Sequence, residues 1–113
     1  MTSIIDAIPI RAPVEEEEEN GLITLIYEKS FTRFERWLQS KIGGPLNIRR
    51  KLDKYGTDVW KMCDGEHTVK DIIKFMRNKY REEMEPVEKR VVTFFKILSS
   101  RNLVYFVSRK EDE

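Results

Sequence analysis

Five consecutive glutamates, Glu15 to Glu19, precede Asn20-Gly21 and an apolar run rich in β-branched residues, Leu22 to Tyr27. The glutamates alone would be typical of a solvated tail, because like charges repel and disfavour compaction. Asn-Gly, however, best tolerates the positive φ angles of a type I′ turn, and a strand-forming run follows it directly. We therefore predict a hairpin of strands 14–19 and 22–28 and rank the disordered tail second. The glutamates would then lie on an edge strand, where charge discourages pairing with a second molecule.

The next segment changes from a helical to a strand period. Apolar residues at spacings of three and four predict a helix over 31–42, capped by Ser30 and ended by Gly43-Gly44-Pro45. A strand over 46–52 follows, because its residues alternate in character. One face carries Leu46, Ile48, Arg50 and Leu52, and the other carries Asn47, Arg49 and Lys51. Arg50 is thus an unexpected charge on the inner face.

From Asp53 onward the pattern predicts three helices. Asp53 caps the first, which ends at Asp64-Gly65, and Thr68 caps the second with Asp71 as a capping-box partner. Glu85-Pro86 opens the third helix, with the proline at the first helical position, and Asn102 ends this helix before a short closing strand over 103–107.

Two aromatic residues are expected to anchor the core shared by the sheet and the helices, Trp60 and Phe95. Phe94 and Phe95 lie about 100° apart around their helix, so one is core and the other is expected to be half-exposed.

These elements predict an α+β fold, a winged-helix-like domain with a small antiparallel three-stranded sheet packed on three helices. With 113 residues, the chain has the size of one domain. We expect residues 14–107 to form this domain, with an N-terminal extension over 1–13 and a charged C-terminal tail over 108–113.

Charge and cysteine usage narrow the class of protein. The net charge is +1, but residues 28–101 carry 18 basic and 11 acidic side chains, whereas the ends are acidic. A single cysteine, Cys63, cannot form an internal disulfide and fits a reducing compartment, so we expect a cytoplasmic protein. The longest apolar runs are far too short to span a membrane, and no membrane partner is expected.

Catalytic groups are scarce. His67, the single histidine, falls in a turn between helices, which makes it a surface residue rather than a general base. Cys63 lies on the apolar stripe of its helix and is interpreted as a small buried hydrophobe. No phosphate-binding glycine loop or metal-ligand spacing is present in the sequence. We therefore predict a protein that is not an enzyme and that uses no cofactor and no metal.

Part of the sequence resembles the PqqD family, the pyrroloquinoline quinone biosynthesis protein D group. The matching residues are Leu52-Asp53, Gly56, Val59-Trp60, Met62-Cys63-Asp64-Gly65, Thr68-Val69, Ile72, Phe94-Phe95, Leu98 and Asn102-Leu103-Val104. The resemblance covers about residues 46–105. It implies a peptide-binding adaptor or chaperone, a recognition element for the leader of a ribosomally synthesised precursor peptide, which it presents to a radical SAM or other peptide-modifying enzyme. The polyglutamate strand and the 31–42 helix depart from the shorter PqqD proteins, so the general role is kept without the quinone pathway.

The resemblance also implies where the leader binds, as an added strand on the third strand and against the third helix. By matching position, the peptide-binding residues are Leu46, Asn47, Ile48, Arg49, Arg50, Lys51, Leu52, Arg90, Phe94, Ile97 and Arg101. Strand addition supplies main-chain hydrogen bonds, so specificity must come from side chains. We expect an apolar anchor near Phe94 and Ile97 and acidic peptide residues near Arg49, Lys51 or Arg101. Whether the protein also forms a homodimer stays open.

A winged-helix DNA-binding regulator is the alternative. It would use Lys89, Arg90, Lys96 and Arg101 on phosphates and bases. Near-neutral net charge disfavours nucleic acid as a partner. Glu85 and Glu88 at the start of the same helix disfavour it further, since they would face phosphate.

Overall fold

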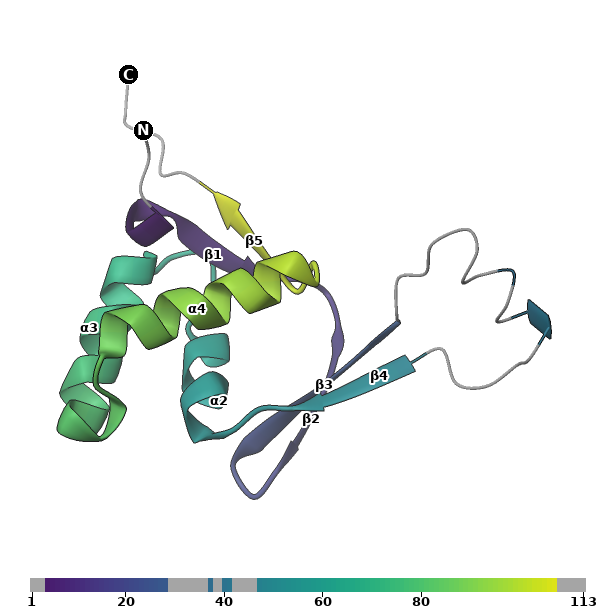
Figure 1. Cartoon of the computed structure of the whole chain (residues 1–113), viewed down its shortest axis with the longest axis horizontal. Helices are drawn as coiled ribbons and strands as arrows, with labels where there is room; N and C mark the ends of the chain where they lie inside the picture. Colours follow the sequence, from purple (N-terminus) through teal and green to yellow (C-terminus); the bar gives the residue numbers. More distant parts are fainter. Residues whose placement is uncertain (1–3, 29–36, 38–39, 42–46, 108–113) are drawn as a thin grey trace. The chain divides into compact units, whose positions relative to one another are not determined.

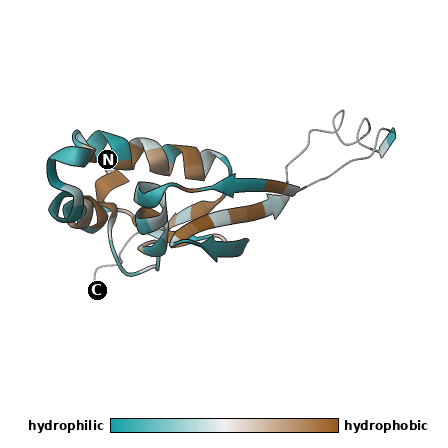
Figure 2. Ribbon diagram, turned by 90° about the horizontal axis from the view of Figure 1, so that it is seen from below, coloured by the Kyte–Doolittle hydropathy of each residue, from teal (hydrophilic) through white to brown (hydrophobic). Residues whose placement is uncertain are grey.

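The computed structural model describes residues 4–28, 37, 40–41 and 47–107. The chain divides into two compact units, Val14–Leu52 and the combination of Met1–Pro13 with Asp53–Glu113. Figure 2 shows that helices and strands carry both apolar and polar segments.

The Val14–Leu52 unit contains a three-stranded antiparallel sheet of order β2-β3-β4. The strands are β2 (Glu15–Glu19), β3 (Leu22–Glu28) and β4 (Asn47–Lys51). The turn between β2 and β3 has φ angles of 55° at Asn20 and 78° at Gly21. Both are positive, as a type I′ turn requires, so the predicted hairpin is confirmed and the glutamates form an edge strand.

The predicted helix over 31–42 falls mostly outside the described residues. Of its positions the structure describes Trp37, Ser40 and Lys41, which are helical. The Ser40 hydroxyl donates to the Trp37 carbonyl oxygen at 2.6 Å.

The second unit contains a two-stranded antiparallel sheet that the sequence analysis did not predict. β1 (Ile8–Arg11) pairs with β5 (Val104–Val107), with Ile8 opposite Val107 and Arg11 opposite Val104 (Figure 1). The other edge of β1 is held by the chain after α2, because the Arg11 amide donates to the Cys63 carbonyl at 3.1 Å. Residues within the expected N-terminal extension therefore form a strand.

Two helices begin where their capping residues predict. α2 (Lys54–Lys61) follows Asp53, whose side chain accepts a hydrogen bond from the Gly56 amide. α3 (Val69–Tyr80) follows Thr68, which forms a reciprocal capping box with Asp71. The predicted start of each of these two helices is confirmed. Both starts were predictable because capping is a local interaction that needs no tertiary contact.

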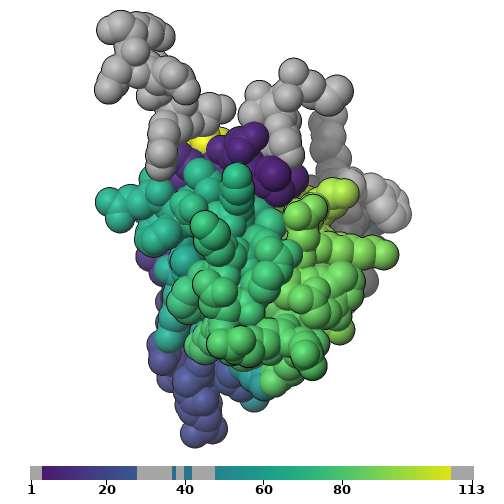
Figure 3. Space-filling view, turned by 90° about the vertical axis from the view of Figure 1, so that its left-hand side faces the viewer, coloured from purple at the N-terminus to yellow at the C-terminus, as the bar shows by residue number. Residues whose placement is uncertain are grey.

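The last helix, α4 (Val87–Ser100), follows the short 3-10 helix η2 (Arg81–Met84). Pro86 is its N-cap rather than its first helical residue. α3 packs against η2 and α4, which lie beside it in Figure 3. Asn102, with φ of 59°, ends the chain's last helical turn before β5.

The burial predicted for Trp60 and Phe95 is confirmed, whereas a core that they share with the three-stranded sheet stays a prediction. Trp60 and Phe95 are both fully buried, whereas Phe94 is half-buried. The Phe95 ring meets Phe106 of β5 edge-on at 5.8 Å between centroids. The α+β class, with three helices in the described residues and a three-stranded antiparallel sheet, is likewise confirmed. The winged-helix likeness and the single-domain boundaries stay predictions.

Candidate functional site

Strand β4 has one edge that is free of strand pairing within the described residues, and we call it the free edge of β4. It pairs with β3 on one side, and among the described residues no strand pairs with its other side. An unpaired edge presents backbone donors and acceptors that an extended peptide can satisfy. Of the predicted binding residues on this strand, Leu46 lies outside the described residues and Asn47 begins the strand.

The outward face of β4 carries two exposed cations, Arg49 and Lys51. Arg49 is already engaged, because its Nη2 atom lies 2.6 Å from Oε2 of Glu17 on β2. Hydrogen bonding and attraction to Arg49 hold the pKa of Glu17 below its usual value. An acidic peptide side chain would have to compete with Glu17 for Arg49, whereas no described side chain forms an ion pair with the ammonium group of Lys51.

On the inner face of β4, a hydrogen bond explains how the charged side chain of Arg50 is accommodated. Ile48 and Arg50 are half-buried and Leu52 is buried, as the alternation predicts. The Arg50 Nε donates to the hydroxyl oxygen of Tyr27 on β3 at 3.2 Å. This bond lets a guanidinium share a face with apolar residues.

A groove runs along α4 in the other unit. It is lined by residues on one side of the helix: Pro86, Lys89, Arg90, Thr93, Phe94 and Ile97. Ile97 is 41% exposed, which is high for a large apolar side chain. Three of the predicted binding residues therefore line one surface, and Arg101 follows as the C-cap residue of the same helix. We call this surface the α4 groove.

The peptide-binding prediction did not include the groove residues Pro86, Lys89 and Thr93. Their positions carry a signal in the sequence, since they recur with the predicted residues at spacings of three and four and so share one helix side. Of these three residues, Lys89 was predicted only to contact nucleic acid.

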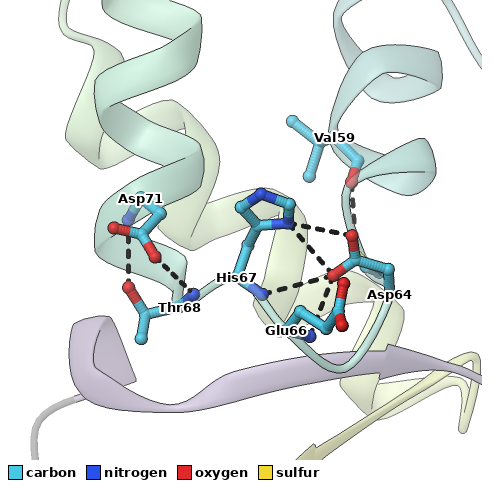
Figure 4. Close-up of polar contacts among 7 residues, drawn as sticks. Val59, Asp64, Glu66, His67, Thr68 and Asp71 are labelled. Atoms are coloured by element: carbon cyan, nitrogen blue, oxygen red, sulfur yellow. Dashed lines mark hydrogen bonds and ion pairs between the residues drawn. The ribbon is translucent and has the colours of Figure 1, made fainter.

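His67 and Asp64 form a turn that is structural in character (Figure 4). The Asp64 carboxylate accepts hydrogen bonds from the backbone amides of Glu66 and His67, and His67 Nδ1 lies 2.9 Å from Oδ2. Burial raises the pKa of Asp64, but these hydrogen bonds outweigh it and leave the pKa below its usual value. The group orders the chain between α2 and α3, and the interpretation of His67 as a turn residue is confirmed.

Cys63 is 1% exposed, and burial raises the pKa of its thiol to about 12. The thiol therefore stays protonated near neutral pH, as expected of a buried hydrophobe. In the part of the chain that the structure describes, no three His, Cys, Asp or Glu side chains are arranged to hold a metal ion. None of its helices combines the length and hydropathy needed to cross a bilayer.

A family model for coenzyme PQQ synthesis protein D (PqqD) matches residues 46–104, slightly more than half of the chain. The chain belongs to the PqqD family. The matched residues include β4 and α4, the two elements that carry the predicted binding surfaces. Comparisons with curated proteins and with solved structures give no match. Membership of the PqqD family agrees with the resemblance found in the sequence.

Proposed function

We propose that this protein is a non-catalytic adaptor that binds the leader of a ribosomally made precursor peptide. The leader adds as a strand to the free edge of β4, and the α4 groove is proposed separately as a surface that accepts an apolar side chain of the peptide. The adaptor then presents the peptide to a modifying enzyme of the radical SAM type. The free edge of β4 is the observation that carries the proposal.

The PqqD family match supports involvement in the biosynthesis of a PQQ-type precursor peptide, and members of this family act as non-catalytic accessory proteins. The chemistry of the described residues agrees with an accessory role, because His67 is engaged in a turn and Cys63 is buried and protonated. Binding rather than catalysis is the function these residues support.

We expect β4 and the α4 groove to recognise different features of the peptide. Main-chain bonds along β4 hold any extended peptide, so they supply affinity without choosing a sequence. Selectivity comes from side chains. Because Glu17 occupies Arg49, acidic peptide residues are expected to pair with Lys51, Arg90 or Arg101 instead. Ile97 and Phe94 accept the apolar anchor.

Backbone methylation of the peptide tests the proposal. The candidate precursor peptides are those encoded beside this protein's gene, and each is titrated into labelled protein while amide shifts are followed. Shift changes are expected in 47–52 and 87–101. N-methylation at one peptide position should abolish binding, whereas methylation at the next should be tolerated, because alternate N–H groups face the sheet edge.

Two controls complete the experiment. Ile97→Asp places a charge in the α4 groove and should weaken binding, whereas Lys74→Gln on the exposed side of α3 should not. Equal sensitivity to methylation at every position would contradict strand addition. Salt-dependent binding to random duplex DNA, with no binding of peptide, would instead favour the DNA-binding alternative.

A further inference from the structure

A second pocket lies between α2 and α4, within the unit that contains both helices. Its volume is about 160 Å³, and one side of it is open to solvent. Its walls include the buried side chains of Val59, Met84 and Val91, with Tyr55 and Phe94 half-buried beside them. Phe94 and Arg90 also line the α4 groove, so the two hollows adjoin. We call this one the α2–α4 pocket.

The pocket depends on a glycine in α2. A Cβ atom added at Gly56 would lie 3.2 Å from Cζ of Phe94 and 3.3 Å from Oδ1 of Asp53. Both separations are tighter than ordinary contacts, so a side chain at position 56 would press on the Phe94 ring. Alanine would favour a helix more than glycine does. The glycine therefore keeps space open at a cost in helix propensity.

Some polar groups around the pocket already form hydrogen bonds within the protein, and one does not. Asp53 accepts the Gly56 amide hydrogen bond at 2.7 Å, and the Tyr55 hydroxyl donates to Glu83 at 2.5 Å. Arg90 is exposed, and among the described residues its guanidinium forms no hydrogen bond or ion pair. An apolar wall with one unengaged guanidinium at its rim matches an apolar group that has a carboxylate close by.

We infer that the α2–α4 pocket binds an aromatic or branched apolar side chain of the peptide whose neighbouring residue is aspartate or glutamate. The apolar side chain enters between Val59 and Phe94, and the carboxylate pairs with Arg90. This inference rests on the proposed peptide-binding function. It adds a sequence preference, an apolar residue next to an acidic one, that strand addition alone cannot supply.

Capped dipeptides test the pocket without strand addition, since they are too short to extend a sheet. N-acetyl-phenylalanyl-aspartyl amide is titrated into the full-length protein, with a Kd expected near ~1 mM because a small ligand buries little surface. Amide shifts should change at Tyr55, Gly56 and Phe94. Gly56→Ala should raise the Kd about tenfold or more, because the added methyl group takes space from the ligand.

A second variant keeps the inference falsifiable if Gly56→Ala alters the fold. Arg90→Gln should weaken binding of the aspartyl dipeptide but leave that of N-acetyl-phenylalanyl-asparaginyl amide unchanged, because the amide has no charge to pair. Lys74→Gln, a matched loss of charge on α3, should bind both like the wild type.

The outcomes separate this inference from the proposed function. The inferred binding at the α2–α4 pocket would be overturned if the dipeptide changed amide shifts only outside the pocket. It would also be overturned if Gly56→Ala and Arg90→Gln both bound the dipeptide like the wild type. Either result would hold even if precursor peptides add to β4. Pocket shifts with the expected variant effects would support it even if no precursor peptide pairs with β4.

Discussion

Arg49 on β4 and Glu17 on β2 form an ion pair with Nη2 and Oε2 2.6 Å apart, although β3 lies between their strands. In the register of the sheet, Arg49 lies opposite Ile26, which lies opposite Glu15. Glu17 is two residues from Glu15 and shares its face of the sheet, so its side chain reaches Arg49 diagonally. The acidic strand thus neutralises part of the basic strand whose free edge is proposed to bind peptide.

Arg49→Gln is expected to raise the pKa of Glu17 toward its usual value, because the hydrogen bond and the attraction that lower it are removed. Since the folded pKa lies below the unfolded one, the pair stabilises the fold above the usual carboxyl pKa, and this contribution is lost as the pH falls through the folded pKa. NMR titration of the Glu17 carboxyl carbon measures the change. Lys51→Gln is the control, and an unchanged Glu17 titration in Arg49→Gln would show that the pair is not formed in solution.

Gly21→Val should destabilise the protein by about 1–2 kcal/mol, the cost of placing a side chain in the left-handed region. Gly21 has a φ of 78°, and no atom lies within 4 Å of an added Cβ, so the cost is backbone strain rather than a clash. Gly21→Asn should cost less because asparagine tolerates this region. Urea unfolding compares the two, and equal midpoints would argue against the type I′ turn.

Phe95→Ala should lower the free energy of unfolding by about 3–5 kcal/mol, since the ring is fully enclosed and its loss leaves a cavity. Phe94→Ala, the adjacent half-buried ring, should cost distinctly less. The urea midpoints of both variants provide the measurement. If Phe95→Ala lowered the free energy of unfolding no more than Phe94→Ala does, Phe95 would not be a core residue.

Tyr80 should ionise only above the usual tyrosine range, because burial and the hydrogen bond it donates to Asp58 at 2.5 Å both raise its pKa. A raised folded pKa favours the neutral form, so this stabilisation is present below about pH 10 and is lost as the pH rises further. Tyr80→Phe should cost about 1 kcal/mol near neutral pH and flatten this alkaline loss.

Stability measured by urea unfolding from pH 7 to 11 tests the Tyr80 prediction. Tyr105→Phe is the matched control, since Tyr105 is 53% exposed. Parallel alkaline profiles for the wild type and Tyr80→Phe would contradict it.

Part of the candidate site was predictable from the sequence. Alternation along 46–52 correctly separated the exposed Arg49 and Lys51 from the half-buried Ile48 and Arg50, because side chains of a strand alternate between faces. Helical spacing likewise grouped Arg90, Phe94 and Ile97 on one side of α4. The partners of these side chains were not predictable, since periodicity gives a direction and not a neighbour.

The sequence by itself determined the local features: the turn at Asn20-Gly21, the cap at Asp53 and the capping box of Thr68 with Asp71. Each depends on backbone angles or hydrogen bonds between residues at most three apart, which residue type encodes directly. Only the tertiary structure decided the β1–β5 pairing, the Arg49–Glu17 pair and the space that Gly56 leaves beside Phe94. These contacts join residues distant in sequence, and they form because packing brings complementary groups together, which neither propensity nor period records.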